Sequence, residues 1–216
     1  MTTIHAIFGV IMTTVVFHCV PAQSQQLSYP EQLIERYSDI QVNVPVGERE
    51  KPMAVLLQEA VSYRDLHPDN AAAWITAGRI RAGHASLLGV TSMLGQMKQV
   101  KADMETAISL DPAAQEGRAQ AFLGMLYTLL PGWPLSFGDG KKGDLLMTEA
   151  MNISDTNPTN CYYYARYLIS KKQYQKAQVY LLRARAAVNA DTAHPYWQKF
   201  QQKNIADSLH VISGNL

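Results

Sequence analysis

The sequence predicts an all-α fold in which helices pair into hairpins that stack one after another. Apolar residues recur every three or four positions in several stretches, and no stretch alternates convincingly with a period of two. Alanine or glycine recurs where paired helices would have to approach closely. Three of the apolar stretches close at signals that stop one helix and start the next: Leu66-His67-Pro68, Leu110-Asp111-Pro112 and Ile153-Ser154-Asp155.

Composition places the chain among globular proteins. Hydrophobic residues make up 47% of its 216 residues and charged residues 17%, which is typical of a chain that can bury a core. Nineteen basic residues against eighteen acidic ones leave a net charge of +1. No basic field is available to attract nucleic acid or an acidic membrane over distance, so neither is expected as a partner.

Residues 1–22 are expected to be a cleaved signal peptide, because they contain no Lys, Arg, Asp or Glu and are mostly apolar from Ile4 to Val20. Two alternatives stay open: a retained membrane anchor, and a lipoprotein signal that ends at Cys19. Cleavage would place the protein in the periplasm or outside the cell, and only a retained segment would hold it at the membrane. Cys161 would then be the one remaining cysteine, so no intrachain disulfide is expected.

Residues 23–51 are expected to form an N-terminal helix and a loop. Ser28 and Glu31 have the spacing of a capping box, which predicts a helix that begins there and runs to Ile40. Pro52 is expected to open the next helix, to Leu66, and with it a solenoid over residues 52–216. These two helices are candidates for a degenerate first hairpin, since Tyr63 stands where a small residue is usual.

The next two hairpins are predicted from apolar and small residues at helical spacing. In one, Gly78 takes the close-approach position of the first helix, whereas Arg81 stands where a large apolar residue is usual. In the other, Gly124 takes the close-approach position. The residues expected to face inward are Trp74, Ala77, Val100, Met104 and Ala107 in the first hairpin, and Gln120, Leu123, Tyr127 and Ala150 in the second.

The last hairpin has the clearest pattern. Its first helix places Cys161, Tyr164, Ala165 and Leu168 on one face, and its second helix places Tyr174, Ala177, Leu181 and Ala184 on another. This layout resembles the tetratricopeptide-repeat (TPR) hairpin, and Ala150 precedes Ala184 by 34 residues, the TPR period. A helix from Pro195 to about Ile212 is expected to cap the solenoid, which would contain about three to four hairpins.

Two of the predicted hairpins are longer than a TPR unit. The excess is assigned to insertions between their helices, at Gly83–Gly95 and Leu130–Lys142. The first insertion is apolar and is expected to be either a long turn under the core or an exposed patch for a partner.

The second insertion carries a more specific resemblance. Its sequence from Leu130 to Asp139, LPGWPLSFGD, resembles a group of exported bacterial TPR proteins with a PGWP…FGD insertion, and the resemblance spans roughly residues 70–190. A fainter likeness is to the TPR accessory component of TRAP-type solute transporters. The resemblance to the exported group implies a location and a scaffold rather than a reaction.

No motif for catalysis, a cofactor or a metal stands out. Gly138–Gly143 contains glycines and lysines, but it lacks the spacing of a phosphate-binding loop. The histidines show no metal-ligand spacing. Cys161 lies at an inward position and is expected to be a buried, inert thiol. We therefore expect a protein that binds rather than catalyses.

The candidate binding site combines the aromatic insertion with the first helix of the last hairpin. The loop is expected to act as the lid of a pocket or to plug a gap in the solenoid. The predicted site residues are Trp133, Phe137, Asn160, Tyr163, Arg166 and Tyr167. The sequence favours a non-enzymatic periplasmic scaffold for protein–protein interaction, with envelope or transporter components as candidate partners. The alternative is a ligand-binding accessory component of a TRAP-type transporter.

Overall fold

The structure, a computed structural model, describes residues 26–215. The predicted signal peptide lies outside the described residues. Within the described residues, no helix has the length and apolar character that a membrane crossing requires.

The described residues fold into α-helices, with two short 3-10 turns and no strand. The predicted all-α class is therefore confirmed. The α-helices are α1 (Tyr29–Asn43), α2 (Glu50–Leu66), α3 (Ala71–Ala85), α4 (Val90–Leu110), α5 (Arg118–Leu129), α6 (Gly140–Ile153), α7 (Pro158–Ser170), α8 (Tyr174–Ala190) and α9 (Pro195–Ser213); the 3-10 turns are η1 (Val46–Glu48) and η2 (Ala114–Glu116).

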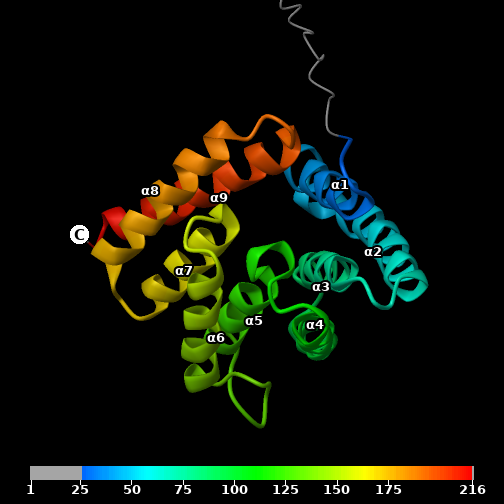
Figure 1. Ribbon diagram of the computed structural model, residues 1–216, viewed down its shortest axis with the longest axis horizontal. Helices are drawn as coiled ribbons and strands as arrows, with labels where there is room; N and C mark the ends of the chain where they lie inside the picture. Colours follow the sequence, from blue (N-terminus) through cyan, green and yellow to red (C-terminus); the bar gives the residue numbers. More distant parts are fainter. Residues whose placement is uncertain (1–25, 216) are drawn as a thin grey trace, which may run out of the picture.

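Neighbouring helices pack as antiparallel pairs. The pairs α3/α4, α5/α6 and α7/α8 form the hairpins, while α2 packs on α3 and α5 packs on α7 (Figure 1). The expected capping box opens α1, since the backbone N–H of Ser28 donates to Glu31 over 2.7 Å. These features give the solenoid-like arrangement that the sequence predicts.

The small residues lie at the helix crossings. Ala165, Ala177 and Ala184 are all fully buried in the α7/α8 hairpin. At Gly124, an added Cβ would stand 3.1 Å from the backbone N of Met147 on α6. At Gly78, it would overlap the end of the Met104 side chain on α4. Larger side chains at these positions would push paired helices apart.

The prediction of an insertion between the helices at Gly83–Gly95 is wrong. Helix α3 continues to Ala85 and α4 begins at Val90, so only four residues connect the two helices. The extra length lies mostly within α4. The physical reason is the helical spacing of Met93, Met97 and Val100, which pack into the core formed with α5. The second insertion is a true loop, and it runs from Leu130 to Asp139 between α5 and α6.

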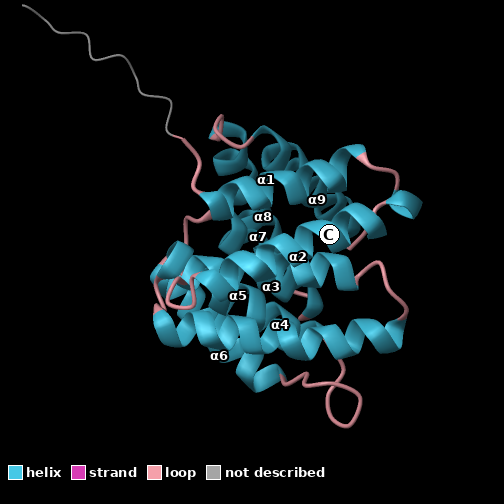
Figure 2. Cartoon of the chain, turned by 90° about the vertical axis from the view of Figure 1, so that its right-hand side faces the viewer, coloured by secondary structure: helices cyan, strands magenta, loops and turns pink. Residues whose placement is uncertain are grey.

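The N-terminal and C-terminal helices meet. As expected, α9 packs along α8 at the end of the last hairpin, but it also packs against α1 (Figures 1 and 2). The Glu35 carboxylate of α1 is buried and accepts the first backbone N–H groups of α9, from Tyr196 over 3.0 Å and Trp197 over 2.9 Å. The helices therefore form a closed ring instead of an open groove.

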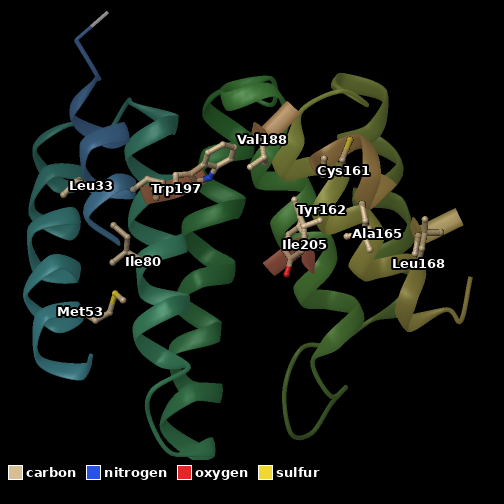
Figure 3. Close-up of a cluster of buried hydrophobic side chains, with 14 of the residues drawn as sticks. Leu33, Met53, Ile80, Cys161, Tyr162, Ala165, Leu168, Val188, Trp197 and Ile205 are labelled. Carbon is tan, nitrogen blue, oxygen red and sulfur yellow. The ribbon is translucent and has the colours of Figure 1, made fainter. Parts of the chain in front are cut away.

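Two hydrophobic clusters fill the ring. One joins α1, α2 and α3 to α7, α8 and α9 through residues such as Leu33, Ile80 and Ile205 (Figure 3). The other lies between α3, α4, α5 and α6 around Met104 and Leu123. Tyrosines of α7 pack against both clusters, so this helix connects them.

Candidate functional site

The structure distributes the six predicted site residues over separate places rather than joining them in one pocket. The loop aromatics Trp133 and Phe137 lie beside α4, and the remaining four residues lie on α7 with different neighbours. Tyr162 packs against Tyr163 of the same helix, Tyr163 also packs against α5, and Tyr164 packs against α8. None of these contacts joins the tyrosines to the Leu130–Asp139 loop, as the predicted site would require.

The loop of Leu130–Asp139 plays two roles at once. Phe137 is partly buried and packs edge-on against Tyr127, with the ring centroids 5.2 Å apart. Trp133, in contrast, is 91% exposed, and it borders a cleft of about 460 Å³ that α4 lines with Lys98 and Lys101. Phe137 therefore attaches the loop to the fold, while Trp133 is presented to solvent.

Asn160 is fully buried and acts within the fold. Its side-chain amide donates to the backbone carbonyl of Glu116 over 2.7 Å and to that of Ser154 over 3.2 Å. Gln115, Glu116 and Gly117 all have positive φ angles, a conformation that is strained for the two residues with side chains. Asn160 thus holds the unusual turn that leads into α5.

The other three predicted residues face three directions. Tyr163 packs against Phe122 of α5 at 5.4 Å between ring centroids. The Arg166 guanidinium donates to the hydroxyl of Tyr162 over 3.1 Å, beside a cleft shared with α9. Tyr167 stacks on Tyr164, and burial raises its pKa to about 12.

A cavity of about 230 Å³ lies between the N-terminal ends of α1, α5, α7 and α9. Pro30, Ile34 and Trp197 supply an apolar wall, whereas Arg118 at the start of α5 supplies a cation and Glu31 and Asp191 supply carboxylates. A small number of polar groups within an apolar lining is typical of sites for small molecules.

A second arginine, Arg79 of α3, acts on the charge of Arg118. Burial first, and then the positive charge of Arg79, lower the pKa of Arg118 to about 10, while Glu116 and Glu31 act to raise it. Arg79 is only 6% exposed. Among residues 26–215, neither guanidinium forms an ion pair with a carboxylate. The carboxylates of Glu116 and Glu31 are nonetheless close enough to act on the charge of Arg118.

A tyrosine of α1 completes this region. The ring of Tyr37 lies over Gly83, where an added Cβ would overlap it. Burial raises the pKa of Tyr37 to about 12, and the charge of Arg79 opposes that rise. Glycine at position 83 thus lets α1 pack closely on α3, with Tyr37 beside Arg79.

These residues were missed by sequence reasoning, although one signal was available. Arg79 is a charged residue in a helix otherwise made almost entirely of small and apolar side chains, Ala71–Ala85. Such a residue is seldom buried without a partner. Arg118 carried no comparable signal, because its position beside α1 and α9 depends on closure of the ring.

The comparison with protein families decides the assignment. The family model described as TRAP transporter T-component matches residues 69–198, more than half of the chain. The chain belongs to the TRAP transporter T-component family. No curated protein matches it. The match supports the fainter of the two resemblances, that to the TRAP accessory component.

The T-component match covers both arginines and the Trp133 loop, because it runs from the start of α3 into the start of α9. It leaves out α1 and α2. The residues Pro30 and Ile34, which line the interior cavity, therefore come from outside the matched segment.

No group of three potential metal ligands occurs among the described residues. The thiol of Cys161 is buried and donates to the carbonyl oxygen of Asp155 over 3.1 Å. Burial raises the pKa of this thiol to about 11, which leaves little thiolate at neutral pH.

Native Cys161 should accordingly resist alkylation. At pH 8, we expect iodoacetamide to modify the folded protein at least ~100-fold more slowly than the urea-unfolded chain, because modification requires an exposed thiolate. Mass spectrometry of time points measures both rates. Equal rates in the two states would show that the thiol is accessible and reactive, contrary to its placement in the core.

Proposed function

We propose that the protein is a non-catalytic accessory component of a TRAP-type solute transporter, exported to the periplasm, which holds a small solute in the cavity between α1, α5, α7 and α9. The match to the T-component family carries this proposal. The match favours the accessory component, whereas the sequence by itself favoured a general scaffold.

The closed ring supports a small solute rather than an extended peptide. Open solenoids receive peptide segments along a continuous groove. Here α1 meets α9, and the cavity between their N-terminal ends measures about 230 Å³. At ~30 Å³ for each water molecule, that space has room for roughly eight waters. A small organic molecule fits this space, whereas a peptide segment does not.

An accessory component also has to contact the rest of its transporter. Trp133 is the most exposed large hydrophobic residue among those described, at 91%, and Leu135 of the same loop is 68% exposed. Exposed tryptophans are frequent anchors of protein interfaces. We assign the contact with a partner protein, such as the transporter's solute-binding protein, to this loop.

Capture from a periplasmic extract tests the proposal. The wild-type protein, used as bait, should retain a solute-binding protein or a membrane subunit of a transporter, identified by mass spectrometry. Trp133→Ala should weaken that capture by about 2 kcal/mol or more in a binding titration. The free energy of unfolding of this variant should differ from that of wild type by less than ~0.5 kcal/mol, because the side chain is exposed.

Val179→Ala serves as the matched control. Val179 is an exposed apolar residue on α8, and its replacement should leave the capture unchanged. Retention of unrelated envelope proteins, with equal yield from wild type and Trp133→Ala, would contradict both the transporter assignment and the role of the loop.

A further inference from the structure

The loop from Leu130 to Asp139 protrudes from the helical ring between α5 and α6 (Figures 1 and 2). It carries two large apolar side chains into solvent, since Trp133 is 91% exposed and Leu135 is 68% exposed. Neighbouring apolar side chains that project into water mark a surface that a binding partner covers. The chemistry around the base of the loop indicates what kind of partner that is.

Hydrogen bonds fix the shape of this loop. The backbone N–H of Gly138 donates to the carbonyl of Pro131 over 2.9 Å, which closes the loop at its base. The backbone N–H of Asp139 donates to the carbonyl of Tyr127 over 2.9 Å, which ties the loop to α5. Trp133 is therefore presented on a fixed support, and such pre-organisation lowers the entropic cost of binding.

Lysines gather at the base of the loop, although the net charge of the whole chain is only +1. The ammonium groups of Lys101 on α4 and Lys142 on α6 lie over the same ring, that of Tyr127, at 5.9 and 5.6 Å from its centroid. Lys98 lies one turn before Lys101 and lines the cleft under the loop. Lys141 begins α6 beside Lys142. Helices α4 and α6 thus bring four lysines together.

The carboxylates that adjoin these lysines neutralise them only in part. Glu105 pairs with Lys101 over 3.6 Å. Asp139 accepts from backbone N–H groups in the first turn of α6, and Asp144 pairs with Lys171 over 3.0 Å. Among residues 26–215, the other three lysines of the group form no ion pair. The surface is therefore positive, and charge complementarity favours an acidic partner.

The cleft between the loop and α4 provides a recess for a side chain of that partner. It measures about 460 Å³, and the loop lines it with Trp133 and Phe137 while α4 lines it with Lys98 and Lys101. Ser136 also lines the cleft, and its buried hydroxyl has no hydrogen-bond partner among residues 26–215. Buried hydroxyls are normally paired. A recess with apolar and cationic walls suits a protruding peptide segment better than the flat face of a lipid bilayer.

We propose that this loop surface binds an acidic segment of a partner protein, whose carboxylates lie against Lys98 and Lys101 and whose apolar side chain packs on Trp133. The lysines attract the segment and fix its orientation, whereas the tryptophan supplies most of the buried apolar area. The surface stands on its own residues. The assignment of the acidic segment to a component of the transporter rests on the proposed function.

Titration with matched peptides tests the charge preference. The probes are a short synthetic peptide rich in Asp, Glu and Leu, its counterpart with Asn and Gln, and its counterpart with Lys. The chain contains three tryptophans, so Trp133→Phe identifies the indole N–H signal of Trp133 in the NMR spectrum of wild type. The acidic peptide should shift this signal, and the other two should bind at least about tenfold more weakly. Equal binding of the acidic and amide peptides, or no shift by the acidic peptide, would overturn the proposal.

Charge variants test the lysines. The double variant Lys98→Gln, Lys101→Gln should bind the acidic peptide at least about tenfold more weakly than wild type, because both cationic partners of its carboxylates are removed. The control, Lys176→Gln with Lys199→Gln, removes two exposed lysines of α8 and α9 and should bind within about twofold of wild type. Equal losses in the two double variants would assign the attraction to overall charge and overturn the proposal.

Anionic vesicles test a membrane as the alternative occupant. In co-sedimentation with vesicles of phosphatidylcholine and phosphatidylglycerol, wild type and Trp133→Ala should sediment to the same extent. Sedimentation of wild type that Trp133→Ala abolishes would assign the loop to a lipid surface and overturn the proposal.

The same lysine variants separate this proposal from the proposed function. In the capture from periplasmic extract, Lys98→Gln, Lys101→Gln should retain about tenfold less of the transporter component than wild type does. Equal retention would overturn the loop surface and leave the accessory role standing. Binding of the acidic peptide at Trp133, without capture of any transporter component, would uphold the loop surface and reject the accessory role.

Discussion

Replacing Asp103 with alanine should lower the free energy of unfolding by about 3–5 kcal/mol, the largest loss that we expect for a single substitution. Asp103 of α4 is fully buried. Its carboxylate accepts from Arg64 of α2 over 3.0 Å and from Arg81 of α3 over 3.2 Å. Alanine would leave two largely buried guanidiniums without their shared counter-ion, so three helices would lose their ionic connection.

A matched control separates burial from pairing. Asp65 also pairs with Arg64, over 2.7 Å, but its side chain is 59% exposed. Asp65→Ala should change the free energy of unfolding by less than about 1 kcal/mol, since exposed ion pairs contribute little. Urea denaturation of both variants provides the measurement. Similar losses in the two variants would show that burial of Asp103 has no special effect.

The ring closure provides the second large effect. Glu35→Ala should lower the free energy of unfolding by about 2–3 kcal/mol, because it removes a buried acceptor of two backbone N–H groups at a helix N-terminus. The partners of Glu35 are the N–H groups of Tyr196 and Trp197, some 160 residues further along the chain. Loss of these bonds should loosen α9 from α1.

Hydrogen exchange locates this effect. Backbone amides of α1 and α9 should exchange faster in Glu35→Ala, while those of the α5/α6 hairpin should keep their protection until global unfolding. Glu105→Ala, which removes an exposed partner of Lys101, serves as the control and should change stability by less than ~0.5 kcal/mol. Unaltered exchange in α1 and α9 would contradict the role of Glu35 in closure.

Much of the fold follows from local patterns. The capping box at Ser28 sets the start of α1, and the buried alanines of the last hairpin lie where helical spacing predicts them. Gly78 and Gly124 lie at close crossings for the same reason, since a helix crossing needs small residues at defined intervals. These signals are contained within one helix or one hairpin.

Local sequence patterns did not predict other features of the structure. In the sequence Arg81 departs from the repeat pattern, and in the structure it reaches a buried carboxylate on the next helix. The sequence places Asn160 among the predicted binding-site residues, whereas the structure buries it against the carbonyl of Glu116. A polar residue on a repeat helix can face solvent or a neighbouring turn, and spacing along the chain does not distinguish the two.

By itself, the sequence determined the all-α class, the hairpins and the contact residues between paired helices, because helical periodicity and the size of side chains act over a few residues. Only the tertiary structure decided that α1 meets α9, and hence that Arg118 lines a cavity between these two helices, α5 and α7. Closure depends on contacts between distant segments, such as Glu35 with the start of α9. Whether a charge is buried or exposed depends on those contacts, so the cavity between these helices forms only when the ring is complete.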